Sequence, residues 1–388
     1  MNILLLTQFL SVTKGGGEYV FSIMANGLAS KGHNVWIITH KIENEDYTHF
    51  HKNVKILFVS KIKYEGGLPP SFKDNINFVL QVIQKGLQLI SKERIELIHS
   101  NNFSPALAGS ILSLLTHKPH ITTIHDVFSL CGKKFWKMWG KQGNISRLNV
   151  FLAPFFEKMT IKLRHDAIHT VSEATKDDLT EFGATRPIYV IPNSIEINNI
   201  EKTSVHPFQF TYLGRLVFYK NLEVVIRAIQ IAKKSFPEII LIIAGGGPHR
   251  ASLERLVSDL KLQDNIKFVG FVSDKEKMEL LSTSQALVFP SLCEGFGLVI
   301  LESFSCGRPV IVSNMRPLSD IIDDKKDGLV VDANDEKKWA EAIISLIQYP
   351  ENTTNMGLQG KKKLEAKFRK DEMINKIESM YHDVISLH

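Results

Sequence analysis

Short apolar runs alternate with longer amphipathic stretches along most of the chain. The runs, such as 3–6 and 35–39, are a few residues long and rich in aliphatic side chains. The stretches between them, such as 18–30 and 72–92, carry apolar residues at helical spacing. Strands that alternate with helices in this way form parallel sheets covered by helices on both faces. The pattern therefore predicts an α/β fold built on doubly wound parallel sheets.

One polar and unpatterned stretch, residues 193–206, interrupts this alternation, which begins again at Phe208. A chain of 388 residues is also long for a single hydrophobic core. We therefore predict two doubly wound domains, residues 1–200 and 207–370, that face a central cleft. A helix at 371–388 is expected to pack back on the N-terminal domain.

The composition is that of a soluble globular protein. Apolar residues make up 44% of the chain, and the longest aliphatic run, 239–243, is far too short to span a membrane. The N-terminus lacks a basic region and a small-residue cleavage site, so we interpret it as a first buried strand. The three cysteines form no C-x-x-C pair, which argues against a zinc site or a disulfide framework and for a reducing compartment. A cytoplasmic protein is expected.

The loop after the first predicted strand contains Gly15, Gly16 and Gly17, and a helix begins near Glu18. Glycines allow a ligand to approach the backbone, and a helix N-terminus attracts anions. The stretch therefore favours phosphate binding over its alternative, a flexible turn with a helix cap. It does not favour a nicotinamide dinucleotide, because Val20 stands where the third glycine of that fingerprint would be.

Two further strands are followed by polar residues. His125 and Asp126 end a hydrophobic strand, and Arg215 and Lys220 follow the first strand of the second domain. An imidazole at a cleft can hydrogen-bond a substrate hydroxyl, and two cations suit a diphosphate whose charge grows as a bond to it breaks. The alternative for His125 is a histidine whose hydrogen bonds are made within its own loop. The alternative for Arg215 and Lys220 is a pair of solvated surface side chains.

The stretch CEGFGLVILESFSCG, residues 293–307, places Glu294 in a loop, Gly297 at a turn and Glu302 inside a predicted helix. A buried carboxylate without a partner is costly, so something must satisfy Glu302. We expect a bound ligand to do so, which would leave Glu302 without a partner in the empty protein.

These motifs resemble the family-4 retaining glycosyltransferases of the GT-B architecture, in which two Rossmann-like domains face one another. PSLCEGFGLVILESFSCGRPVI is similar to the E-x7-E signature of that family, and YLGRLVFYKN is similar to its Arg/Lys phosphate clamp. GGGEYVFSIMANGLASKGHNVWIIT, IHD, VIPNSI and LIIAGGGP follow the family pattern in the same order. The resemblance covers nearly the whole chain.

The resemblance implies a role for each matching residue. Glu302 would accept hydrogen bonds from the ribose of a nucleotide-sugar, Glu294 would contact the transferred sugar, and His125 would touch that sugar. Arg215 and Lys220 would neutralise the diphosphate leaving group. Backbone N–H groups would assist them, at Gly15, Gly16 and Gly17 and at Gly297, Leu298 and Val299.

The implied reaction is transfer of a hexose-type sugar with retention of anomeric configuration, by front-face attack in which the leaving phosphate takes the acceptor proton. No Asp-x-Asp sequence occurs, and the two cations and a helix dipole can do the neutralising work of a metal. We therefore expect no cofactor and no metal. UDP- and GDP-sugars both remain candidate donors, and lipid-linked, polysaccharide and small-molecule acceptors all remain open.

Residues 133–165 carry eight Lys/Arg and one acidic residue, interleaved with aromatic side chains. This composition is typical of an element attracted to anionic lipid, on the inner face of a membrane for a cytoplasmic protein. The alternative is a loop that lines the cleft, followed by a helix whose aromatic residues face the core. No nucleic-acid recognition motif accompanies the charge, so nucleic acid is not an expected partner.

Two other functions stay open from the sequence. One is a sugar-nucleotide epimerase or hydrolase of the same architecture, which an assay with donor alone would distinguish. The other is a binding protein that keeps the fold without catalysis.

Overall fold

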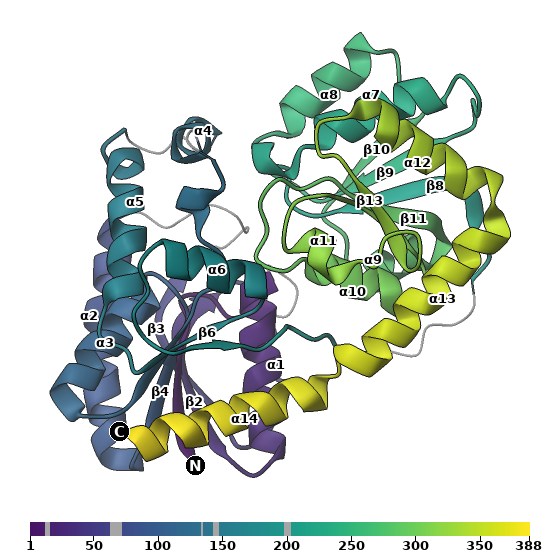
Figure 1. Cartoon of the computed structure of the whole chain (residues 1–388). Helices are drawn as coiled ribbons and strands as arrows, with labels where there is room; N and C mark the ends of the chain where they lie inside the picture. Colours follow the sequence, from purple (N-terminus) through teal and green to yellow (C-terminus); the bar gives the residue numbers. More distant parts are fainter. Residues whose placement is uncertain (12–15, 63–71, 133–134, 143–146, 198–202) are drawn as a thin grey trace. The chain divides into compact units, whose positions relative to one another are not determined.

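The computed structural model describes residues 1–11, 16–62, 72–132, 135–142, 147–197 and 203–388. They form two compact units, each built on one parallel β-sheet flanked by helices (Figure 1). Of the described residues, those within 1–136, 145–194 and 370–388 belong to the first unit, and those within 137–144 and 195–369 belong to the second. The predicted α/β class with doubly wound parallel sheets is confirmed.

The first unit has a seven-stranded sheet in the order β3-β2-β1-β4-β5-β6-β7, with every neighbouring pair parallel. Its strands are short and almost fully buried near the centre, as expected for a parallel sheet covered on both faces. The strands are β1 (Asn2–Leu6), β2 (Asn34–Ile42), β3 (Val54–Ile62), β4 (Leu97–Ser100), β5 (His120–Thr123), β6 (Ala167–Thr170) and β7 (Ile188–Val190).

Alternate residues of β1 supply two apolar cores. Ile3 and Leu5 pack with α1 (Gly16–Ser30) and α14 (Lys370–Leu387) on one face of the sheet. Leu4 and Leu6 pack with α2 (Phe72–Glu93) and α3 (Ser104–Thr116) on the other. Figure 1 shows α14 beside α1, and a Cβ added to Gly27 of α1 would lie 2.5 Å from the Ile374 side chain. The C-terminal helix is therefore part of the first unit. Between β5 and β7 the chain also forms α4 (Phe135–Gln142), α5 (Arg147–Lys162) and α6 (Glu173–Glu181), of which α5 and α6 belong to the first unit.

The second unit has a six-stranded parallel sheet in the order β10-β9-β8-β11-β12-β13. Its strands are β8 (His206–Leu213), β9 (Ile240–Ala244), β10 (Ile266–Gly270), β11 (Ser284–Phe289), β12 (Val310–Ser313) and β13 (Gly328–Val331). Its helices are α7 (Leu222–Ala232), α8 (Arg250–Asp259), α9 (Asp274–Thr283), α10 (Leu298–Ser305), α11 (Leu318–Ile321), α12 (Glu336–Gln348) and α13 (Pro350–Lys367).

The strand order reverses direction once in each sheet. β1 lies between β2 and β4, and β8 lies between β9 and β11. Ligands of open α/β sheets bind beyond the carboxyl ends of the strands at such a reversal. The loops after β1, β8 and β11, which carry most of the predicted site residues, lie at these positions.

The domain limits predicted from the sequence differ from the structure at both boundaries, since the second unit begins at Ile195 and ends at Arg369, and at one internal segment. The range 1–200 includes residues 137–142, yet these residues belong to the second unit. They do so because Trp139 stacks on Tyr219 and Gln142 hydrogen-bonds His249, and both partners belong to that unit. A pattern of strands and helices contains no information about such contacts between distant segments.

Candidate active site

The loop that carries Arg215 is built on close contacts between two glycine-containing loops. Gly214 follows β8 with φ at +153°, and a Cβ on Gly245, just after β9, would lie 1.9 Å from the carbonyl oxygen of Gly214. A Cβ on Gly247 would lie 2.3 Å from the carbonyl oxygen of Leu216. Only glycine allows this approach. The glycines of LIIAGGGP therefore support the Arg215 loop, a role that the sequence alone did not reveal.

Arg215 and Lys220 both contact the side chain of Tyr219. The Arg215 guanidinium donates a hydrogen bond to the Tyr219 hydroxyl, with 2.9 Å between Nη2 and Oη. The Lys220 ammonium, at the end of the 3₁₀ turn Phe218–Lys220, lies 5.3 Å from the Tyr219 ring and 5.2 Å from the Phe289 ring. The structure therefore brings the two predicted phosphate-binding cations together around one buried aromatic ring.

Glu294 forms an ion pair with Lys220 in which both side chains are largely buried, with 14% and 9% exposed. The loop that carries Glu294 is attached to the same turn, because the N–H of Leu292 and the hydroxyl of Ser291 both donate to the carbonyl of Tyr219, at 2.8 and 3.3 Å. Two residues that the resemblance assigned to different parts of the substrate thus neutralise one another in the ligand-free protein.

The helix α10 begins directly after Gly297, whose φ of +95° lies in the left-handed region. A Cβ at this position would lie 3.0 Å from Leu318, so the turn is both strained and crowded for any other residue. Leu298 and Val299 are the first residues of α10, and their N–H groups have no acceptor within the helix. They offer hydrogen bonds to an anion at this end.

Glu302 has a partner within the protein. Its Oε1 lies 2.6 Å from Nζ of Lys277 on α9, and the same ammonium lies 2.9 Å from Asp274. Burial lowers the pKa of Lys277, but the two carboxylates outweigh it and raise that pKa above its usual value. The expectation that Glu302 lacks a partner in the empty protein was therefore wrong.

In the first unit, His125 lies beside the start of α1. A Cβ on Gly17 would lie 3.2 Å from Nε2 of His125 and 3.9 Å from the amide nitrogen of Asn101, the residue after β4. The carboxyl ends of β1, β4 and β5 therefore place Gly17, Asn101 and His125 together. Gly16 opens the same helix, whereas Gly15 lies outside the described residues. Asn101 belongs to none of the motifs above, although a pair of asparagines directly after an apolar strand is a signal for it.

The His125 imidazole is neutral at physiological pH. Burial, with a smaller contribution from the nearby His169, lowers its pKa to about 3. Its Nε2 is buried and has no hydrogen-bond partner among the described residues. A buried polar atom without a partner is costly in a folded protein, and a ligand hydroxyl placed here would satisfy it.

A polar network lies beneath His125 and attaches the C-terminal helix to the sheet. His99 on β4 contacts the Tyr381 hydroxyl of α14 at 2.6 Å and the Thr123 hydroxyl at 2.7 Å, and Thr123 contacts His169 at 2.9 Å. All four side chains are buried. Sequence periodicity did not predict this network, because histidine and threonine in an apolar strand read as ordinary strand residues.

Glu157 of α5 holds the turn that follows His125 and Asp126. Its two carboxylate oxygens accept the N–H groups of Phe128 and Ser129 at 2.7 and 2.9 Å. Burial raises the pKa of Glu157, and these hydrogen bonds partly oppose that effect. The one acidic residue of the basic segment thus has a structural role at the predicted site.

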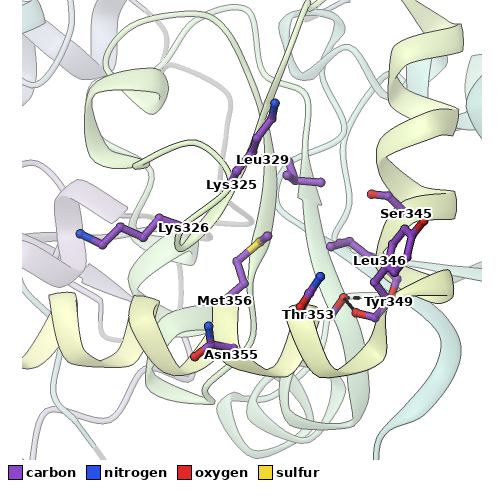
Figure 2. A pocket seen from close by; sticks show the side chains of 10 residues that line it. Lys325, Lys326, Leu329, Ser345, Leu346, Tyr349, Thr353, Asn355 and Met356 are labelled. Carbon is purple, nitrogen blue, oxygen red and sulfur yellow. Dashed lines mark hydrogen bonds between the residues drawn. The ribbon is translucent and has the colours of Figure 1, made fainter.

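One cavity of about 280 Å³ lies in the second unit between β13, α12 and α13 (Figure 2). Its lining includes Lys325, Leu329, Tyr349 and Met356, and none of the predicted site residues. Among the described residues, no group of three or more His, Cys, Asp or Glu side chains is placed to hold a metal ion. The described helices also include none that is long and apolar enough to cross a membrane.

Comparison with known proteins agrees with this architecture. Residues 14–199 match the family described as Glycosyltransferase Family 4, and residues 193–363 match Glycosyl transferases group 1. The alpha-maltose-1-phosphate synthase of Mycolicibacterium smegmatis is 25% identical, over 75% of this chain and 80% of its own.

Two solved structures resemble the fold closely. Sucrose-phosphate synthase of Thermosynechococcus elongatus has a TM-score of 0.80 at 20% identity and covers 100% of both chains. HepE of Anabaena, solved with UDP and glucose, has a TM-score of 0.75 at 18% identity and covers 99% of this chain and 100% of its own. The two parallel sheets of this chain and these neighbours confirm the predicted GT-B fold class. The chain belongs to the family-4, group 1 glycosyltransferases and is a glycosyltransferase.

Proposed function

We propose that the protein transfers a hexose-type sugar, with retention of anomeric configuration and without a metal, from a nucleoside-diphosphate-sugar to an acceptor hydroxyl. One observation carries the proposal. Arg215 and Lys220 meet around Tyr219 at the carboxyl end of β8, the strand at which the second sheet reverses its order. Two fixed cations at that position suit a diphosphate leaving group.

The Lys220–Glu294 pair acts as a switch on donor binding. An arriving diphosphate competes for the Lys220 ammonium, which frees Glu294 to accept hydrogen bonds from the hydroxyls of the donor sugar. The helix N-terminus at Leu298 and Val299 adds N–H groups and a positive dipole end for the phosphate oxygens. Positive charge is therefore in place before the leaving group becomes fully anionic.

The ribose of the donor is held by Glu302. Its carboxylate is oriented by Lys277, so it presents its remaining lone pairs to the two ribose hydroxyls without a large loss of side-chain freedom. In the first unit, the neutral His125 contacts the sugar, which satisfies its partnerless Nε2, and the start of α1 at Gly16 and Gly17 offers N–H groups to the diphosphate.

The chemical step exchanges one bond for another on the same face of the sugar. The bond between the anomeric carbon and the phosphate oxygen breaks, and the acceptor oxygen forms its bond from that face. The acceptor proton passes to an oxygen of the leaving phosphate. The products are the glycosylated acceptor and the nucleoside diphosphate, and no protein side chain becomes covalently attached.

The acceptor is a lipid-linked molecule, a polysaccharide or a small molecule, and α5 favours the lipid-linked class. A single exposed stripe on α5 carries both aromatic and basic side chains, at Arg147, Phe151, Phe155, Lys158 and Lys162. Phe151 and Phe155 are 79% and 63% exposed. The alternative, in which the aromatic residues of this helix face the core, does not hold for these two. We propose that the stripe contacts anionic lipid at a membrane surface.

The function is tested by a donor screen. The protein is incubated with UDP- and GDP-sugars and with lipid and saccharide acceptors, and release of UDP or GDP is followed. UDP is the first choice, because the fold relative HepE was solved with UDP and glucose. The anomeric configuration of the product is read by NMR. Conversion of the donor without an acceptor would favour an epimerase or hydrolase, and no turnover with any donor would favour a binding protein.

A further inference from the structure

We propose that residues 139–142 of α4, named here the brace, position Arg215 and Lys220 for the diphosphate. The inference rests on the proposed function, because it assumes that these cations bind a diphosphate. The brace is distant from residues 215–220 in the sequence, yet it belongs to the same compact unit. It touches the loop 215–220 at two points, one through Gln142 and one through Trp139.

Gln142 fixes the backbone of the loop. Its side-chain oxygen accepts the N–H of Phe218 at 3.1 Å, and its side-chain nitrogen donates to Nδ1 of His249 at 2.7 Å. A backbone N–H can only donate, so the atom of the Gln142 side-chain amide that faces the Phe218 N–H is the oxygen. Nδ1 of His249 therefore accepts, and the ring proton sits on Nε2, which bonds the Glu223 carboxylate at the start of α7. The N–H of His249 also donates to Leu216 at 2.9 Å.

Trp139 fixes the side chains of the loop. Its ring stacks on Tyr219 with 5.9 Å between centroids and 28° between planes. Tyr219 in turn accepts the Arg215 guanidinium and lies beneath the Lys220 ammonium. The ring that sets the spacing of the two cations is therefore held by Trp139.

These contacts make Trp139 and Gln142 positioning residues that do not themselves touch the substrate. Without them, Phe218 loses an acceptor and the Tyr219 ring loses one packed face. The loop must then become ordered when the diphosphate arrives, and that cost reduces affinity for the diphosphate. Affinity for a nucleoside, which lacks phosphates, does not depend on Arg215 or Lys220. It is therefore the same in the brace variants as in the wild type.

The test compares Gln142→Leu and Trp139→Ala with Lys141→Ala, an exposed position on the same helix. Titration calorimetry measures binding of UDP and uridine, or of GDP and guanosine if the wild type prefers them. We expect both brace variants to bind the diphosphate at least about 5-fold more weakly, the effect of one lost hydrogen bond or aromatic pair. They should bind the nucleoside as the wild type does. Trp139→Phe, which keeps a stacked ring, should recover most of the affinity.

The outcomes separate the inference from the proposed function. If the wild type binds neither diphosphate, the proposed function fails. A second outcome is that the wild type binds the diphosphate and Arg215→Ala does not. If both brace variants then bind the diphosphate as tightly as the wild type, the brace inference is overturned. Equal weakening of UDP and uridine in folded brace variants, checked by thermal unfolding, also overturns it, because that result indicates general damage to the unit. Should Trp139→Ala fail to fold, Trp139→Phe and Gln142→Leu give the same comparison.

Discussion

Lys277 on α9 and Glu302 on α10 form an ion pair of 2.6 Å, and Asp274 supports the same ammonium. Both members of the pair are mostly buried, with 25% and 18% of their side chains exposed. The carboxylate that looked out of place in an apolar helix is therefore paired and held in orientation by the protein itself. Lys277 becomes part of the proposed ribose site, although the sequence patterns assign it no role.

Lys277→Met should weaken binding of the nucleoside as well as the diphosphate. The variant leaves Glu302 a partly buried carboxylate without its partner, at a cost of about 1–3 kcal/mol, and removes the contact that orients it. Calorimetric titration with uridine and UDP measures the effect, and exposed Lys275→Met on the same helix is the matched control. Unchanged uridine affinity in Lys277→Met would contradict the ribose assignment. In the brace variants, by contrast, only the affinity for the diphosphate should fall.

Glu294→Ala should reduce kcat/KM strongly while the fold is retained. The variant removes the carboxylate assigned to the donor sugar, and we expect a loss of about 2–4 kcal/mol in transition-state stabilisation. The measurement is steady-state release of the nucleoside diphosphate, with Glu341→Ala, an exposed glutamate on α12, as control. A turnover rate equal to that of the wild type would remove Glu294 from the site.

Local patterns in the sequence predicted the elements, but not the pairs that complete the site. Alternation of apolar runs and amphipathic stretches indicated both parallel sheets, because burial of each strand on two faces leaves a local signature. The order of the strands then placed the loops of Gly17, Arg215 and Glu294 at the strand ends.

The contacts between non-adjacent elements left no such signature. Lys277 reads as one of several charges on a polar helix, and only the packing of α9 on α10 brings it to Glu302. Gln142 and Phe218 are 76 positions apart and belong to no shared motif. The face of α5 on which Phe151 and Phe155 lie depends on which side packs inward, and Glu157 settles this by bonding the turn at Phe128.

Turnover should survive treatment with EDTA. The proposed neutralisation of the leaving group relies on Arg215, Lys220 and the start of α10, and none of these groups needs a divalent cation to act. The measurement compares initial rates before and after EDTA treatment and after addition of Mg²⁺ or Mn²⁺. A rate that falls with EDTA and returns with either ion would show that the metal-free proposal is incorrect.

Acid should destabilise the first unit well above the pH at which carboxylates titrate. Burial lowers the pKa of His120, His165 and His169 to about 4 each. An unfolded histidine titrates near 6.5, so between pH 6.5 and about 4 the unfolded state binds protons that the folded state does not. The free energy of unfolding therefore falls as pH falls through this window, by up to about 1.4 kcal/mol per histidine and pH unit.

Urea unfolding at pH 7 and pH 5 measures this loss, and His165→Leu isolates one contribution. Both ring nitrogens of His165 are buried and have no hydrogen-bond partner among the described residues. The variant should therefore be less sensitive to acid than the wild type. An equal loss of stability in the two proteins between pH 7 and pH 5 would contradict the assignment of a buried, neutral His165.

Phe151→Ser should reduce binding to anionic vesicles, because it removes the most exposed aromatic ring of the α5 stripe. Flotation with vesicles of phosphatidylglycerol and phosphatidylcholine measures the bound fraction. Leu358→Ser on α13 is the matched control, since it removes a half-exposed apolar side chain from the other unit. Lys158→Glu should weaken binding further, and salt should weaken the wild type, because the basic part of the stripe acts through screened charge. Binding that resists salt and is reduced equally by Phe151→Ser and Leu358→Ser would mean that the stripe is not the membrane contact.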